Sequence, residues 1–233
     1  PVQMAENSRE FLKADPDRPF FLYFCTSDPH RGGGIVEESP QRPDRFGNLP
    51  GGYQGVEPER YRPDEVIVPP FLSDNPAVRA ELAQYYQSVS RLDQGLGRLL
   101  AVLKETGVYA DTLIIYISDH GIAFPGAKTT VYEPGLLSPA IVRHPRVGKR
   151  GVVSDAMISW VDITPTILDY AGVETPEYEP HVAYDLLRKQ MGERHGLHGR
   201  SFLGILEEAR PQGWEEIYAS HTFHEIQMYY PMR

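Results

Sequence analysis

The sequence has little cysteine, an excess of acid over base, and no long apolar run. Its one cysteine, Cys25, excludes an internal disulfide framework and every zinc site that needs several cysteines. The 23 Lys and Arg against 32 Asp and Glu leave a net charge of −9, and no basic run supplies the phosphate neutralisation that nucleic acid or an anionic membrane requires. No stretch approaches the roughly 20 apolar residues of a membrane span. We therefore expect neither nucleic acid nor a membrane as a partner.

The 233 residues, 41% of them hydrophobic, are enough to bury one large core. The chain opens with PVQMAENSRE, which has neither a starting methionine nor the basic and then apolar character of a leader. We expect Pro1 to be an internal boundary, so that a targeting signal of the parent protein is not visible. The composition marks no second boundary within residues 1–233.

The pattern of apolar residues predicts an α/β fold. Short apolar runs suit strands at 20–26, 113–117 and 139–143, with a further strand around 217–220. A long helix is predicted from the Asn75 cap and Pro76 to about Gly107, and shorter helices at about 162–172 and 201–209. This alternation favours a mostly parallel sheet flanked by helices on both faces.

The segment at 31–70 is rich in Gly, Pro and charge and is too long for an ordinary connection. It is either a structured functional loop or a mobile one. We expect a structured loop.

Asp119 and His120 follow the run at 113–117, and Gly121 lets the backbone turn sharply behind them. A carboxylate and an imidazole together can bind a metal ion. A turn with a capping Asp and a neighbouring surface His would use the same residues. The position of Asp119 and His120 after a predicted strand does not favour the metal site over the capped turn.

His30 follows the run at 20–26 in the same way, within the sequence SDPH. A single His at a strand end is more often polar surface than catalytic, but neighbouring strand ends in an open α/β sheet share one crevice. Lys128 lies a short distance beyond His120. It is either an ordinary solvated lysine or, in a site for a tetrahedral anion, a point charge for one oxygen.

Several motifs together resemble the sulfatase family of the alkaline phosphatase superfamily. Residues 111–145, DTLIIYISDHGIAFPGAKTTVYEPGLLSPAIVRHP, are similar to the family's strand, Ser-Asp-Asn/His-Gly turn, basic residue, Tyr-Glu and second strand. Residues 161–172 resemble its Asp-x-x-Pro-Thr-x-Leu helix, and 198–202 its Gly-Arg-Ser-Leu element. The resemblance implies an alkaline-phosphatase-like fold, incomplete at the N-terminus, with residues 1–233 forming part of the catalytic domain.

Within the family the chain resembles the heparan N-sulfatase (N-sulfoglucosamine sulfohydrolase) branch, above all in DPHR at 28–31 and in the Phe-Pro at 124–125. The resemblance implies that Asp119 and His120 are metal ligands, that Lys128 contacts the sulfate, and that His30 lies beside the scissile bond as proton donor or oxygen contact. His224 and Glu225 either line a sugar pocket or decorate a strand edge. The sugar-side candidates are Asp28, His224 and Glu225.

The resemblance also implies a reaction, a cofactor and a partner. The reaction would be hydrolysis of a sulfuric ester or sulfamate in a sulfated saccharide such as N-sulfoglucosamine, as in heparan sulfate degradation. One divalent cation is implied, with Ca²⁺ expected, while His120 at a position often filled by Asn leaves Mn²⁺, Mg²⁺ or Zn²⁺ open. Lys128 replaces the arginine of heparan N-sulfatase, which exchanges a bidentate fork for a point charge. A homodimer stays open, and export to a periplasm or lysosome is the family's expectation.

The family's nucleophile is a formylglycine made from a Cys/Ser-x-Pro-x-Arg motif, and neither this motif nor the early Asp-Asp metal pair occurs in the sequence. Cys25 lies in CTSDP, which is not such a motif, and we expect it to be a buried strand residue. The parent protein would contain the formylglycine, and this chain alone would be inactive.

Two other functions stay open at this stage. A phosphodiesterase or phosphonate monoester hydrolase of the same superfamily could use the same Asp-His-Gly turn. A non-catalytic sugar-binding module, or an inactive fragment, would account for the missing nucleophile motif.

Overall fold

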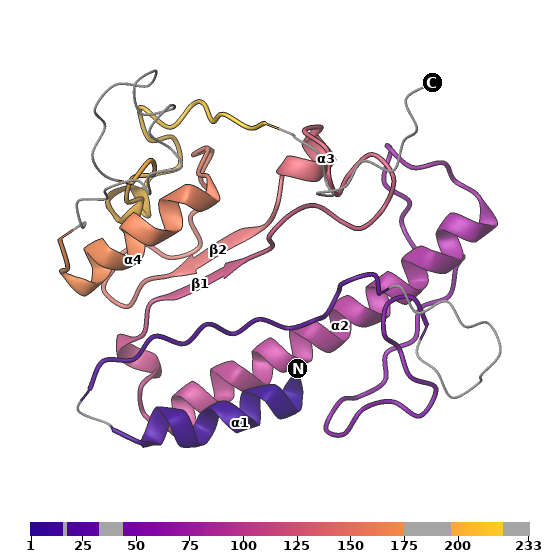
Figure 1. Cartoon of the computed structure of the whole chain (residues 1–233), viewed down its shortest axis with the longest axis horizontal. Helices are drawn as coiled ribbons and strands as arrows, with labels where there is room; N and C mark the ends of the chain where they lie inside the picture. The colour runs from indigo at the N-terminus through magenta and orange to yellow at the C-terminus, as the bar shows by residue number, and fades with distance from the viewer. Residues whose placement is uncertain (16–17, 33–43, 175–196, 221–233) are drawn as a thin grey trace, which may run out of the picture. The chain divides into compact units, whose positions relative to one another are not determined.

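The computed structural model describes residues 1–15, 18–32, 44–174 and 197–220 (Figure 1). They belong to two compact units: unit 1 comprises Pro1–Thr112 and His120–Ser138, and unit 2 comprises Leu113–Asp119 and Pro139–Arg233. The composition of the sequence does not mark this division. In the part of the chain that the structure describes, no helix combines the length and the apolar character that a membrane crossing requires.

Helix α2 (Pro76–Glu105) is the longest element of unit 1 and confirms the helix predicted after Asn75. The Asn75 side chain accepts hydrogen bonds from the amides of Ala77 and Val78, at 3.1 and 3.0 Å, and so satisfies two N–H groups that lack helical partners. Pro76 occupies the first turn, where its missing N–H costs nothing. The buried apolar side chains of α2 are Leu82, Ala83, Leu99, Val102 and Leu103.

Helix α1 (Val2–Lys13) lies alongside α2 in unit 1 (Figure 1). This helix is not among those predicted from the sequence, although Ala5, Ser8 and Leu12 repeat at the spacing of one helix face and are the buried residues of the helix. Ala5 is fully buried and Leu12 is 4% exposed. The helix is therefore held in place mainly by apolar packing against its neighbour.

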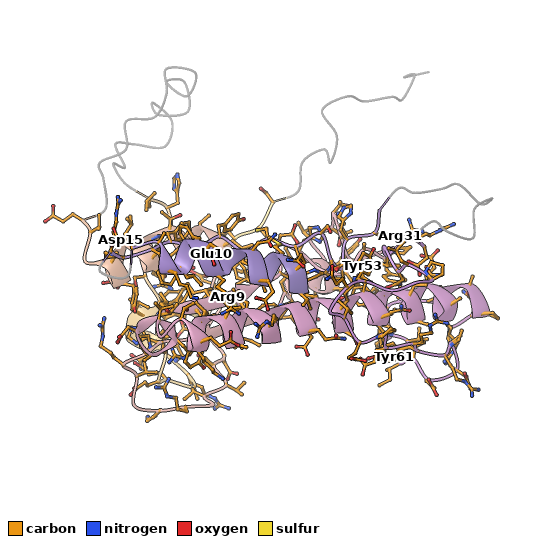
Figure 2. The ribbon with its side chains drawn as sticks, turned by 90° about the horizontal axis from the view of Figure 1, so that it is seen from below. Arg9, Glu10, Asp15, Arg31, Tyr53 and Tyr61 are labelled. Carbon is orange, nitrogen blue, oxygen red and sulfur yellow. The ribbon has the colours of Figure 1, made fainter. Side chains whose placement is uncertain are left out.

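Charged side chains border the contact between α1 and α2. Arg98 donates hydrogen bonds to Glu6 and Glu105, and Arg9 pairs with Glu105 at 2.6 Å. Figure 2 shows Arg9 between the two helices. The hydrogen bond from Arg98, followed by that from Arg9, lowers the pKa of Glu6 below its ordinary value. Because all four groups are partly or largely exposed, solvent weakens the contribution of this network to stability.

Residues 44–72 pack against the N-terminal half of α2. The Phe46 side chain, 1% exposed, stacks on Phe124 with ring centroids 5.9 Å apart and meets Tyr85 edge-on at 5.6 Å. Val66 and Leu82 are buried in the same core cluster. This packing confirms the prediction of a structured loop for 44–70, while 33–43 lie outside the described residues.

Residues 20–26 are extended, but no strand is assigned there within the described ranges. Their side chains alternate between partly buried and exposed, and Phe21 and Tyr23 are 66% and 79% exposed. Cys25 is also exposed, so the prediction of a buried cysteine is wrong. An apolar run becomes a strand buried on both faces only where neighbours cover both faces. In residues 20–26, the described part of the chain covers only one face.

In unit 2, strands β1 (Ile114–Ile117) and β2 (Ala140–Arg143) confirm two of the predicted strands. They pair antiparallel, with Ile114 opposite Arg143 and Ile117 opposite Ala140. This ladder is the sheet present in the described part of the chain. The mostly parallel sheet flanked by helices on both faces therefore stays a prediction.

The 3-10 helix η2 (Trp160–Asp162) leads into helix α4 (Ile163–Ala171), which confirms the helix predicted at 162–172. Gly172 ends α4 with φ of 67°, in the left-handed region that favours glycine. The helix expected at 201–209 is reduced to the 3-10 turn η4 (Leu203–Ile205), since a glycine at position 204 weakens a helix interior. The strand expected around 217–220 is not assigned.

Asp162 links α4 to the segment that precedes η4. Its carboxylate accepts hydrogen bonds from the amides of Ser159, at 2.8 Å, and Arg200, at 2.9 Å, and the residue is 6% exposed. Thr166 donates its hydroxyl to the Asp162 carbonyl at 2.7 Å and accepts the Phe202 amide at 3.2 Å. Two motifs far apart in the sequence are thus joined through one buried carboxylate and one buried hydroxyl.

Candidate functional site

Asp119 follows the C-terminal end of β1 in unit 2, as the sequence predicts. Its side chain is exposed, and its backbone carbonyl accepts the indole N–H of Trp160 at 3.1 Å. The start of η2 is therefore tied to the turn that bears the carboxylate. This contact of Trp160 could not be predicted from the sequence, since no local pattern links a tryptophan to a carbonyl 41 residues earlier.

His120 is the first residue of the second segment of unit 1 and is partly buried. Its Nδ1 lies 2.7 Å from the Gly121 carbonyl oxygen. A carbonyl can only accept, so Nδ1 bears the proton, and Nε2 is the nitrogen with a lone pair in the neutral ring. Histidines that bind metals are commonly oriented by such a bond from the other ring nitrogen.

Gly121 lets the chain pass very close to another backbone segment. Its amide donates to the Gly135 carbonyl at 3.1 Å, and a Cβ at position 121 would lie 1.8 Å from the Pro134 carbonyl oxygen. No side chain fits at that distance. The glycine behind His120 is required by this close approach, which places helix α3 (Glu133–Leu136) directly behind the turn.

Lys128 lies in a compact loop that begins at His120. The Lys128 amide donates to the Ile122 carbonyl at 3.1 Å, and the Ala127 amide donates to Phe124 at 3.2 Å. Phe124 is 7% exposed and Ala127 is fully buried, so the loop is fastened to the core of unit 1. Lys128 itself is partly buried.

His30 lies in a tight turn of unit 1 and is exposed. Its amide donates to the Ser27 carbonyl at 2.8 Å, and the Thr26 hydroxyl donates to the Asp28 carbonyl at 2.8 Å. The turn therefore presents the imidazole to solvent while its backbone is internally bonded.

The Asp28 carboxylate is bound by two side chains of α2. Arg91 donates from Nε to Oδ2 at 2.8 Å and from Nη2 to Oδ1, and Ser88 donates to Oδ1 at 3.2 Å. The two charged side chains are 10% and 5% exposed. The sugar contact predicted for Asp28 stays a prediction, and no local sequence pattern indicates Arg91 as its partner.

Asp119, in unit 2, and His120, in unit 1, each have a side chain of a type that binds divalent cations. A carboxylate oxygen and an oriented imidazole suit a divalent cation of intermediate softness, and the Nδ1 bond of His120 fits that use. Across the four described ranges, no three His, Cys, Asp or Glu side chains form a cluster able to bind a metal on their own. His224 and Glu225 lie outside the described residues.

Comparison with known proteins agrees with the motifs. A model of the sulfatase family matches residues 2–173, and one described as N-sulphoglucosamine sulphohydrolase, C-terminal, matches 124–230. Human N-sulphoglucosamine sulphohydrolase is 41% identical over 229 residues, which cover 97% of this chain and 43% of that protein. An N-acetylglucosamine-6-O-sulfatase from Bacteroides thetaiotaomicron is 39% identical over 100 residues, 41% of this chain and 18% of that protein.

Among solved structures, a phosphonate monoester hydrolase from Silicibacter pomeroyi aligns with a TM-score of 0.46 and 30% identity, over 66% of this chain and 28% of that one. The chain spans less than half the length of the curated relatives named above. The model of the sulfatase family matches most of this chain, residues 2–173, and the chain therefore belongs to the sulfatase family.

Proposed function

We propose that the protein containing this chain hydrolyses the sulfate group of N-sulfated glucosamine. The observation that supports this most directly is the 41% identity to human N-sulphoglucosamine sulphohydrolase along 97% of the chain. The residue chemistry agrees, because an imidazole, an ammonium group and an Asp-His pair suit a tetrahedral anion whose leaving atom needs a proton. The overall charge of −9 makes such local positive groups necessary for an anionic substrate.

Lys128 would bind one oxygen of the sulfate and offset the negative charge that the sulfate oxygens carry during the transfer. Its loop is internally hydrogen-bonded and anchored through buried Phe124, so little reorganisation is needed during the reaction. A divalent cation bound by Asp119 and His120 would supply further positive charge to the sulfate oxygens. We propose Ca²⁺ as this cation. The nucleophile of the proposed reaction is a formylglycine that lies outside this sequence.

His30 would donate the proton that the leaving nitrogen needs. When the sulfur–nitrogen bond breaks, its electron pair stays on nitrogen, and a proton from the imidazolium converts this nitrogen into a neutral amine. The exposed position of His30 lets the ring recover a proton from water between turnovers. Histidine is the side chain that most often transfers a proton in general acid–base catalysis.

The test is sulfate release by the natural-length protein from D-glucosamine N-sulfate, with D-glucosamine 6-O-sulfate and a phosphonate monoester assayed in parallel. We expect the N-sulfate to be the preferred substrate. Lys128→Ala should lower kcat by about 10²–10³-fold, the range for losing one charge-stabilising group. His30→Asn should lower it by about 10²–10⁴-fold, as for a general acid.

Lys104→Ala provides a matched control, because Lys104 is also in unit 1 but lies 5.0 Å over the Tyr109 ring, away from the proposed groups. The kcat of the Lys104→Ala variant should stay at the wild-type value. Turnover of the phosphonate alone would replace the proposal with a phosphonate monoester hydrolase. Binding of the sugar without turnover would favour a sugar-binding module.

A further inference from the structure

Arg91 is a buried arginine of α2 whose single guanidinium group contacts two separate segments of unit 1. It is 4% exposed and pairs with Asp28, as described above. It also donates to the side-chain oxygen of Asn48 at 2.6 Å and to the carbonyl of Phe46 at 3.0 Å. The planar fork of an arginine can serve several acceptors in fixed directions, which a lysine cannot reproduce.

The first of these contacts leads to His30. Asp28 lies two residues before His30, within the turn closed by the bond from the His30 amide to the Ser27 carbonyl. With both carboxylate oxygens bound by Arg91, the Asp28 end of the turn has a fixed position on α2. Such an engaged carboxylate acts as an anchor, which leaves it poorly suited to bind a sugar hydroxyl.

The second contact leads to Lys128. Arg91 binds the Phe46 carbonyl, and the Phe46 ring stacks on Phe124 with an interplanar angle of 16°. Phe124 lies within the loop closed by the bond from the Lys128 amide to the Ile122 carbonyl. The position of this loop in unit 1 therefore depends on where Arg91 holds residue 46.

Two neighbouring contacts support the same arrangement. Arg31, directly after His30, donates to both carboxylate oxygens of Glu81 on α2 at 3.2 Å, so the turn is fastened to the helix on both sides of the histidine. The Tyr53 ring covers Arg91, with the guanidinium carbon 4.9 Å from its centroid. Figure 2 shows Arg31 and Tyr53 on the same side of α2.

We infer that Arg91 is a positioning residue for the reaction proposed above, because it holds the His30 turn and the Lys128 loop on one helix. Arg91 itself touches neither the substrate nor the reacting atoms. The inference rests on the proposed function for its effect on turnover, but not for its effect on the two segments.

The test uses Arg91→Met in the natural-length protein and measures amide hydrogen exchange at His30 and Lys128, whose amides are both hydrogen-bonded in these segments. Removing one partner of a buried ion pair should speed both exchanges by about 100-fold or more. The Phe202 amide in unit 2, bonded to Thr166, should keep its rate. With D-glucosamine N-sulfate, kcat should fall while KM changes little, and Arg91→Lys should restore part of the protection at His30.

A double variant, Asp28→Leu with Arg91→Met, separates positioning from stability. Replacing both partners of a buried pair by apolar groups commonly restores stability, so the melting temperature should return toward the wild-type value. Exchange at His30 and Lys128 should stay fast and kcat should stay low. If amide protection at His30 and Lys128 and kcat all recover together with the melting temperature, Arg91 acts only on stability and the inference is wrong.

Arg98→Met is the matched control, since Arg98 lies on the same helix but binds Glu6 and Glu105. It should leave both amides unchanged. If Arg91→Met leaves the His30 and Lys128 amides at wild-type rates in a folded protein, the inference is wrong. A wild-type protein without activity on the N-sulfate would overturn the proposed reaction alone, because the exchange rates still decide whether Arg91 holds the two segments.

Discussion

The two units of the chain fasten distant segments in different ways. In unit 1, arginine side chains bind carboxylates: Arg91 pairs with Asp28 across 63 residues, and Arg98 pairs with Glu6 across 92. In unit 2, the carboxylates of Asp162 and Glu207 bind backbone amides instead. Asp162 accepts from Arg200 across 38 residues, and Glu207 accepts from the backbone of residues 148 and 149.

This difference sets what a mutation leaves behind. Deleting one member of a buried charge pair strands the other charge in a poorly hydrated place, which is costly. Deleting a carboxylate that binds only amides leaves neutral N–H groups unsatisfied, which costs less. Unit 1 should therefore be more sensitive to the loss of one buried charged side chain than unit 2.

The largest effect is expected from Asp28→Leu in unit 1. This change leaves Arg91 charged and 4% exposed without its main partner, and should lower the free energy of unfolding by about 3–5 kcal/mol. Glu81→Leu removes the partly exposed pairs that Glu81, on the same helix, makes with Arg31 and Arg45, and should cost about 0–1 kcal/mol. Denaturant titration of both variants measures the difference. Equal losses would mean that burial does not distinguish the two pairs.

In unit 2, Asp162→Ala should lower the free energy of unfolding by about 1–3 kcal/mol, because the amides of Ser159 and Arg200 lose their acceptor. Asp162→Asn should cost less, since its one oxygen can still accept from one of them. Asp155→Ala is the control: Asp155 pairs with Arg210 at 3.3 Å on the surface. A larger loss for Asp162→Ala than for Asp28→Leu would contradict the comparison of the units.

The sequence predicts best the elements whose signals are local. Asn75 followed by proline marks the start of α2, and Gly172 marks the end of α4, because caps and left-handed turns depend on one or two residues. The run at 113–117 predicts β1, and the Asp119-His120 pair follows it as expected. Motif spacing also led to the sulfatase family, which the family comparison confirms.

Contacts between distant segments could not be predicted in this way. Nothing near Asp28 in the sequence indicates that its partner is an arginine 63 residues later, and the sugar contact predicted for Asp28 stays a prediction. The antiparallel pairing of β1 with β2 likewise depends on the path of the connecting residues rather than on the composition of either strand. The exposed face of 20–26 was missed because an apolar run predicts extension but not what covers it.

Helix α2 offers a case within unit 1 that should behave like unit 2. The Asn75 side-chain oxygen accepts only from backbone amides, so Asn75→Ala should cost about 1 kcal/mol, well below the cost of losing Asp28. Asn75→Asp keeps an acceptor oxygen and should retain most of the stability. Denaturant titration and amide exchange at Val78 measure the effect. A loss near that of Asp28→Leu would show that the type of partner is not what separates the units.

The smallest effect is expected from pH at Glu207. Hydrogen bonds from the Gly148 amide, and then from the Lys149 amide, hold the pKa of Glu207 below its ordinary value. A carboxyl whose pKa is lowered by folding stabilises the fold above its unfolded pKa of 4.5, and this contribution is lost as the pH falls through the lower folded value. Exchange at Gly148 and Lys149, expressed relative to the intrinsic rate at each pH, should therefore accelerate only in acid.

Glu207→Gln tests whether titration is the cause, because glutamine keeps an acceptor oxygen but has no proton to gain. In this variant, protection of the two amides should be somewhat weaker at neutral pH and independent of pH in the acid range. The backbone fastening of unit 2 would then respond to acid through one carboxylate, whereas the apolar core around Phe46 in unit 1 has no group of this kind among its buried members. Acid loss of protection in Glu207→Gln equal to that in the wild type would assign the effect to another group.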